Sequence, residues 1–270
     1  MPFVELPTSP HALRNRPVKI HYRDVGSGRT VIFLHGGWGY RVYPVNRQTK
    51  EFEDLLRFII PDRSGYGRST RLSGDVPTDF HQRAAEETLL VLDELGIQRA
   101  TFWGHSDGAV IVAMIGLSAP QRCERLILEA FQFRRNKPSS RSFFKKFATH
   151  PEELNENTQK LLIADHGEDQ WSKVVQRNCC AWLKLAAESK LSVDDLADDL
   201  YDGRLSQLTV PVTFIHGKGD PRTEPGEIER AHEAVRGAEL RFIEVGRHSP
   251  HSEKESWREF DAILAELLTK

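Results

Sequence analysis

Short apolar runs alternate along the chain with longer segments of helical spacing. Residues 30–35 form a continuous apolar run that stops at a glycine pair, which is typical of a strand buried on both faces. Similar runs predict strands at 57–60, 100–103, 125–130, 209–216 and 239–245, and a weaker alternation predicts an edge strand at 18–22. Helical spacing predicts helices at 80–95, 109–119, 226–235 and 253–268. Strands alternating with helices predict an α/β fold with a mostly parallel sheet covered on both faces.

One long segment breaks this alternation. Residues 133–205 show helical patterning without a convincing buried strand, and Pro138 and Pro151 interrupt it. A helical block between two strands of one sheet is expected to be an insert that covers the sheet edge. We therefore predict a core made of residues 1–132 and 206–270, and an inserted helical cap made of residues 133–205.

Composition and charge exclude several classes of protein. The 270 residues carry a formal net charge of -2, which argues against a nucleic-acid partner bound by bulk electrostatics. The three cysteines, two of them adjacent, suggest thiols in a reducing compartment. Residues 1–10 lack the apolar core of a secretory signal, and the apolar stretch 109–115 is far shorter than the roughly 20 residues of a membrane helix. The expected location is the cytoplasm, without a membrane partner.

The first candidate for chemistry is the sequence Gly-His-Ser-Asp-Gly at 104–108, set between a predicted strand and a predicted helix. The bare G-x-S-x-G pattern is common, but this context favours a strained strand-to-helix turn that exposes the Ser106 hydroxyl at the carboxyl end of the sheet. A serine nucleophile needs a histidine base and an acid that orients it. Asp220 and His248 each follow a later predicted strand, in the order expected for a nucleophile-elbow hydrolase.

Each partner of Ser106 has an alternative. His251 could replace His248 as the base, and Glu129, at the end of the strand before the insert, could replace Asp220 as the acid. Glu224 is a weaker candidate for the acid because it lies beyond Pro221.

An oxyanion hole requires two main-chain N–H donors. The amide of Asp107 follows the nucleophile directly and is the first candidate. The second is expected from the loop at 35–39, with Gly37 as first choice and Trp38 as second. The Asp107 carboxylate would oppose a negative charge in this hole, so we expect it to turn away or to pair with a cation, and Asp107→Asn to retain activity.

Aromatic residues and a basic run frame the expected substrate pocket. Its candidate lining residues are Trp38, His105, Phe131, Trp171 and Trp182. Six basic residues between 134 and 146 have no acid among them, and they either attract anionic substrates or form a solvated surface. No metal or cofactor is expected, because the chain has no H-E-x-x-H, no phosphate-binding loop and no G-x-G-x-x-G after a strand.

These motifs together resemble the α/β-hydrolase superfamily, which includes small esterases, lactonases, C–C bond hydrolases and proline iminopeptidases. The resemblance rests on the segments 35–37, 62–69, 104–108, 217–221 and 246–251. The last one resembles a family segment, Gly-x-His-x-Pro-His, whose first histidine is catalytic, and this favours His248 over His251. The family also implies a mobile helical cap after the sixth strand.

Departures from family patterns narrow the expected activity. Dehalogenases and epoxide hydrolases of this fold carry an aspartate where this chain has Ser106, and proline iminopeptidases usually carry Gly-Gly-Ser-Trp-Gly at the elbow. We therefore predict a serine hydrolase that cleaves a small ester, lactone or related carbonyl compound through an acyl-enzyme. The alternatives are a C–C bond or aminopeptidase-like hydrolase, and a small-molecule receptor or degenerate hydrolase.

Overall fold

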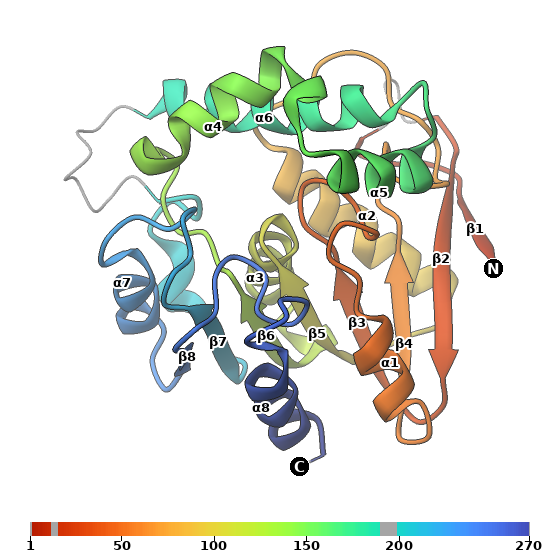
Figure 1. Cartoon of the computed structure of the whole chain (residues 1–270). Coiled ribbons are helices and arrows are strands. Elements are labelled where there is room, and N and C mark those ends of the chain that lie inside the picture. The colour runs from red at the N-terminus through yellow and green to blue at the C-terminus, as the bar shows by residue number, and fades with distance from the viewer. Residues whose placement is uncertain (1, 12–15, 190–198, 270) are drawn as a thin grey trace.

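An eight-stranded sheet forms the centre of the computed structural model, which describes residues 2–11, 16–189 and 199–269 (Figure 1). The strand order is β1-β2-β4-β3-β5-β6-β7-β8; β2 pairs antiparallel with β1 and with β4, and all other neighbouring strands pair in parallel. The strands are β1 (Phe3–Leu6), β2 (Val18–Gly26), β3 (Arg29–Leu34), β4 (Leu56–Pro61), β5 (Ala100–His105), β6 (Cys123–Glu129), β7 (Val212–Gly217) and β8 (Glu239–Ile243). The expected α/β architecture with a mostly parallel sheet is confirmed.

Alternate residues of the central strands enter two different cores. Val31 and Phe33 of β3 pack into one hydrophobic cluster, whereas Ile32 and Leu34 pack into the other. A strand buried on both faces has no polar positions, which explains the continuous apolar runs in the sequence. One face is covered by α2 (Phe80–Glu94), α3 (Asp107–Ser118) and α7 (Glu227–Ala234), and the other by α1 (Asn46–Phe52) and α8 (Trp257–Thr269) (Figure 1).

Two elements were absent from the sequence-based prediction, and one strand was misplaced. Helix α1 was not predicted, since it is polar apart from Phe52 and spans only seven residues. Strand β1 was not predicted either, because only Val4 and Leu6 are buried. As β1 pairs with β2, the segment at 18–22 belongs to an inner strand, and the prediction that it forms the sheet edge was wrong.

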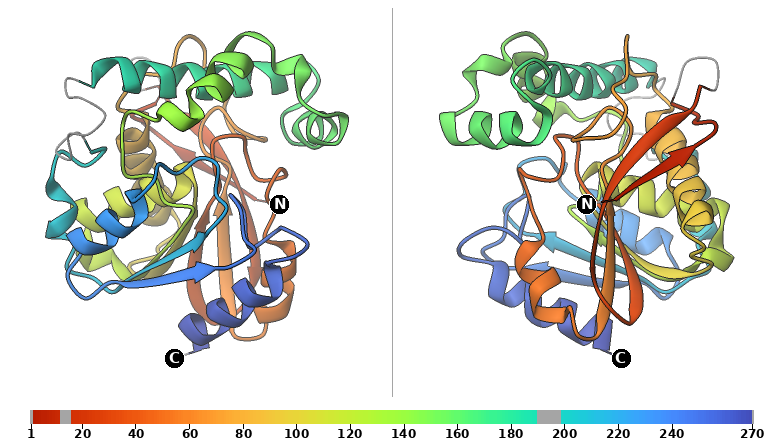
Figure 2. Two further views of the ribbon diagram at one scale, coloured as in Figure 1. Left: turned by 60° about the vertical axis from the view of Figure 1, so that its left-hand side comes forward. Right: turned by 90° about the vertical axis from the view of Figure 1, so that its right-hand side faces the viewer.

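Three further helices lie across the carboxyl end of the parallel strands. They are α4 (Pro138–Thr149), α5 (Glu156–His166) and α6 (Trp171–Glu188), and both views of Figure 2 show them as a layer above the sheet. Residues 190–198 of the predicted cap lie outside the described part of the chain. We use the name cap for α4, α5 and α6.

Acidic residues around the start of α7 hold the beginning of the cap. Glu227 accepts hydrogen bonds from the main-chain N–H groups of Phe133 and Arg134 and forms a buried ion pair with Lys137. Glu224 accepts two hydrogen bonds from Ser139. These contacts attach the cap to the core next to the site described below.

None of the helices described for this chain is both long enough and apolar enough to cross a membrane.

Candidate active site

A strained turn places Ser106 at the carboxyl end of β5. Its φ of 55° and ψ of -119° lie in a region that non-glycine residues rarely adopt, and such strain is typical of functional sites. A β-carbon on Gly104 would collide with the main chain of Gly108, and one on Gly108 with the carbonyl oxygen of Leu34. Both glycines are therefore required for helix α3 to start this close to β5 and β3.

Ser106, His248 and Asp220 lie in one hydrogen-bonded row. The Ser106 Oγ is 3.1 Å from His248 Nε2, and His248 Nδ1 is 2.9 and 3.0 Å from the two carboxylate oxygens of Asp220. The side chain of Asp220 is 1% exposed, whereas that of His248 is 18% exposed and reaches the cavity. Burial alone would raise the pKa of the Asp220 carboxyl, but the charge of His248 and its hydrogen bond lower this pKa below the usual value.

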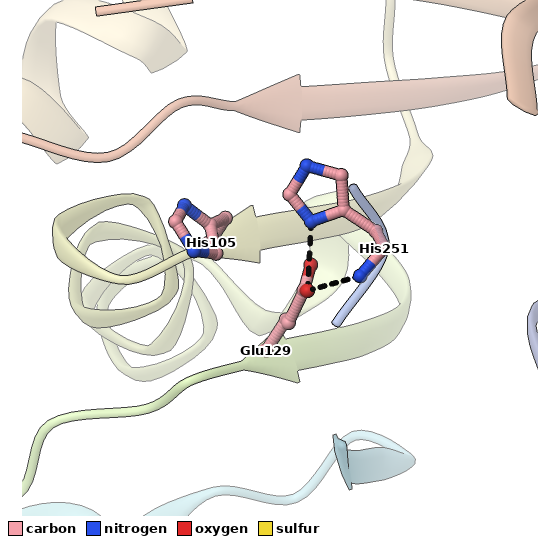
Figure 3. A group of neighbouring side chains, drawn as sticks. All are labelled: His105, Glu129 and His251. Atoms are coloured by element: carbon pink, nitrogen blue, oxygen red, sulfur yellow. Dashed lines mark hydrogen bonds and ion pairs between the residues drawn. The ribbon is translucent and has the colours of Figure 1, made fainter. Parts of the chain in front are cut away.

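The alternative base and the alternative acid bind each other instead. His251 Nδ1 is 2.7 Å from Glu129 Oε1, and the His251 main-chain N–H also donates to this oxygen, as Figure 3 shows. His251 Nε2 faces the carbonyl oxygen of Tyr43 at 3.1 Å. Both ring nitrogens of His251 thus face acceptor oxygens. Glu129 and His251 thus form a buried hydrogen-bonded pair that is separate from the row containing Ser106.

His105 lies between the two histidines of the loop at 246–251. Its ring centroid is 5.3 Å from that of His248 and 5.1 Å from that of His251. Its Nε2 lies 3.0 Å from the carbonyl oxygen of His248 and 2.9 Å from the Ser249 hydroxyl. Burial lowers the pKa of the His105 imidazole to about 3, so the ring is neutral and supports the loop that carries His248.

The second alternative acid, Glu224, binds Ser139 at the start of the cap, away from this row.

A cavity of about 410 Å³ opens between Ser106 and the cap. Three of the predicted lining residues, Trp38, His105 and Trp182, line it. The predictions for Phe131 and Trp171 were wrong. Phe131 is fully buried against Tyr201 and Phe214, and Trp171 packs inside the cap. Further lining residues that the sequence did not indicate include Tyr43, Gln132, Phe143, Phe144, Phe147, Asn178 and Arg222.

The predicted oxyanion donors border the same cavity. Gly37, Trp38 and Asp107 all line it, together with Ser106. Among the main-chain hydrogen bonds of the described residues, none uses the amide N–H of these three residues. Main-chain amides at this cavity that have no other main-chain acceptor are suited to bind a negative oxygen. The structure therefore leaves Gly37 as the first choice and Trp38 as the second, each combined with Asp107.

The Asp107 carboxylate is held by the cap. Asn178 donates a 2.7 Å hydrogen bond to one oxygen and Trp182 a 3.0 Å hydrogen bond to the other, while His81 Nε2 lies 3.5 Å away. Burial alone would raise the pKa of Asp107, but His81, Arg63 and Trp182 lower it to about 2. Asn178 also packs directly on Gly37, where a β-carbon would collide with its amide group. Asn178 of the cap thus contacts two of the three candidate oxyanion donors, Asp107 and Gly37.

Replacing Asp107 with asparagine is expected to lower the free energy of unfolding by about 1–3 kcal/mol at pH 7, while turnover is retained. An asparagine offers one acceptor oxygen and turns an NH₂ group toward the second donor. Because the folded pKa of about 2 lies below that of the unfolded chain, the stabilisation is present above about pH 4 and is lost as the pH falls toward 2.

Urea titrations of the wild type and the variant at pH 7 and pH 3 measure this difference, which is expected to shrink at pH 3. Asp54→Asn, at an exposed position, is the matched control. A large loss of turnover in a folded Asp107→Asn protein would instead place this carboxylate in the mechanism.

The comparisons with known proteins concern the fold family of the chain. Residues 29–180, more than half of the chain, match a family model described as "alpha/beta hydrolase fold". The human protein named serine hydrolase BPHL is 23% identical over 236 residues, which cover 87% of this chain and 78% of that protein. The chain also resembles the solved esterase from Exiguobacterium antarcticum, with a TM-score of 0.73, 20% identity and coverage of 97% and 99%.

An epoxide hydrolase from Bacillus megaterium has a similar structure, with a TM-score of 0.69 at 21% identity and coverage of 94% of this chain and 98% of that one. These likenesses show a common fold, while the match to the family model shows membership. The chain belongs to the α/β-hydrolase fold family.

Proposed function

We propose that this protein is a serine hydrolase in which Ser106 is the nucleophile, His248 the general base and Asp220 the acid that orients it. The observation that carries the proposal is the hydrogen-bonded row, with Ser106 Oγ 3.1 Å from His248 Nε2 and His248 Nδ1 2.9 Å from Asp220. The positive φ of Ser106 supports it, because this turn points the hydroxyl toward the cavity at the end of the sheet.

The reaction would proceed through an acyl-enzyme. Ser106 Oγ attacks the substrate carbonyl carbon while His248 Nε2 takes the hydroxyl proton, and the amides of Gly37 and Asp107 bind the oxyanion. His248 then gives this proton to the leaving oxygen as its bond to the carbonyl carbon breaks. His248 then takes a proton from a water molecule, which attacks the acyl carbon, and returns this proton to Ser106 Oγ as the bond between that oxygen and the acyl carbon breaks. Throughout, Asp220 holds Nδ1 protonated and stabilises the imidazolium.

The proposed substrate is a small ester, lactone or related carbonyl compound. A cavity of about 410 Å³ accepts a small molecule, and its aromatic walls suit an apolar body. A relative from Comamonas testosteroni, 32% identical over 114 residues that cover 40% of this chain and 38% of that protein, is named as a hydrolase of a hydroxy-oxo-phenylhexadienoate. This relative supports a second candidate activity, the cleavage of a C–C bond by the same three residues, Ser106, His248 and Asp220.

A fluorophosphonate probe tests the nucleophile, since it reacts covalently with activated serines. The wild type is expected to be labelled on Ser106, and Ser106→Ala is expected to lose all labelling. Ser118→Ala, at the exposed far end of helix α3, is the matched control and should be labelled like the wild type. An unlabelled wild type would contradict the proposal, and labelling that survives in Ser106→Ala would place the nucleophile elsewhere.

A further inference from the structure

Arg222 brings a guanidinium group to the wall of the active-site cavity. Among the described residues that line this cavity, it is the only arginine or lysine. Its main-chain N–H donates a 2.8 Å hydrogen bond to Asp220, which fixes its backbone beside the acid of the proposed triad. The guanidinium carbon lies 3.2 Å from the centroid of the Phe143 ring, and Phe143 stacks on Trp38 at 5.4 Å.

No hydrogen bond or ion pair of this guanidinium exists with any residue that the structure describes. The carboxylates that line or underlie the cavity are engaged elsewhere: Asp107 with Asn178 and Trp182, Glu153 with Lys146, and Asp220 with His248. Arg222 is half-buried, and this burial lowers the pKa of its guanidinium. A guanidinium has five N–H donors in a planar fork that matches a carboxylate, and removing these donors from water without an acceptor is costly.

The basic run at 134–146 does not fill this role. Lys137 pairs with Glu227, Arg135 with Asp202, and Lys146 with Glu153. No basic residue of this run lines the cavity in the part of the chain that the structure describes. The positive charge that a substrate would meet next to Ser106 therefore comes from the loop after β7.

We propose that Arg222 is a specificity-determining residue, and that the substrate is a carbonyl compound with a carboxylate at one end, which pairs with this guanidinium. The inference rests on the proposed hydrolase function and names its substrate class. Phe143 and Trp38 would pack against the apolar part that joins the carboxylate to the reacting carbonyl. Ser106 and His248 line the same cavity as Arg222, so both ends of one small molecule can be bound together.

Two pairs of esters test this inference. In the first pair, the p-nitrophenyl half-ester of adipic acid is compared with a neutral isostere in which an isopropyl group replaces the carboxylate. The second pair consists of two aryl butyrates whose phenol, the leaving group, carries either a carboxylate or an isopropyl group. The measured quantity is the ratio of kcat/KM for the charged ester to kcat/KM for the neutral ester, compared between the wild type and each variant.

Arg222→Gln is expected to lower this ratio at least about tenfold in one of the pairs, mainly through a higher KM for the charged ester. Arg222→Lys should keep part of the preference, since it retains the charge but loses the fork. Arg247→Gln is the matched control: Arg247 is exposed and adjacent to His248, but does not line the cavity, so the ratio should not change.

The outcomes separate this inference from the proposed function. Neutral-ester hydrolysis and fluorophosphonate labelling that persist in Arg222→Gln show that the variant is folded and active. If both persist and the ratio does not change in either pair, the inference about Arg222 is wrong while the hydrolase function stands. An equal fall of the ratio in Arg247→Gln would also overturn it, since general attraction of anions would then explain the preference. No hydrolysis and no labelling of the wild type would overturn both proposals.

Discussion

His248→Ala is expected to lower kcat about 10⁶-fold. Losing the base of a serine triad has an effect of this order, because the serine hydroxyl is then a poor nucleophile. His248 is partly exposed to the cavity, with 18% of its side chain accessible, but its removal leaves the buried Asp220 carboxylate without its histidine, so a loss of stability is expected as well. Steady-state hydrolysis of a p-nitrophenyl ester measures kcat, and urea unfolding measures stability.

His251→Ala is the matched comparison, because His251 lies three residues away on the same loop. Its removal leaves the fully buried Glu129 without its histidine partner, which is expected to cost about 3–5 kcal/mol of stability. The folded fraction of this variant should still react with the fluorophosphonate probe. If folded His251→Ala lost ester hydrolysis and probe labelling while His248→Ala kept both, His251 would be identified as the base.

Gly108→Ala is expected to destabilise the protein by about 3 kcal/mol or more, although alanine is the better helix former. Helix propensity alone would favour alanine by about 1 kcal/mol. The added β-carbon, however, would meet the carbonyl oxygen of Leu34 in β3, and main-chain atoms at the centre of the sheet yield only by moving the helix. Such a movement would also displace Ser106 from the loop that carries Gly37.

Gly116→Ala, further along the same helix, is the matched control for this effect. There a β-carbon would meet the side-chain ends of Leu126, at 2.5 Å, and Leu208, at 2.9 Å. Side-chain ends can rotate, so Gly116→Ala should cost less stability than Gly108→Ala and should leave probe labelling intact. Equal stabilities of the two variants in urea unfolding would contradict the close approach of α3 to β3.

Local pattern in the sequence was enough to predict the α/β fold and the position of Ser106. Strands such as β3 and β4 are buried on both faces, so their sequences contain continuous runs of apolar residues, and such runs predict a buried strand. The turn at Ser106 depends on the glycines at 104 and 108, which lie within a few residues of it. The polar helix α1 and the half-exposed strand β1 have no such continuous signal, so these two elements were not predicted.

Contacts between distant segments were decided only by the tertiary structure. From the sequence, two histidines were candidates for the base that acts with Ser106, and three acidic residues were candidates for the acid that orients it. In the folded chain, His248 pairs with Asp220, and His251 pairs with Glu129. Asp220 and Glu129 are both buried, and a buried carboxylate is destabilising unless it is paired, so each of them needs a histidine partner.

The docking of the cap likewise brings Asn178 to Asp107 and Phe143 to Arg222, contacts that span dozens of residues of sequence. Spacing along the chain carries no information about such contacts, because they depend on where α4 and α6 meet the core. The sequence by itself therefore determined the fold and a set of candidate catalytic residues. Which of them lie together, and which cation faces the substrate cavity, was decided by packing.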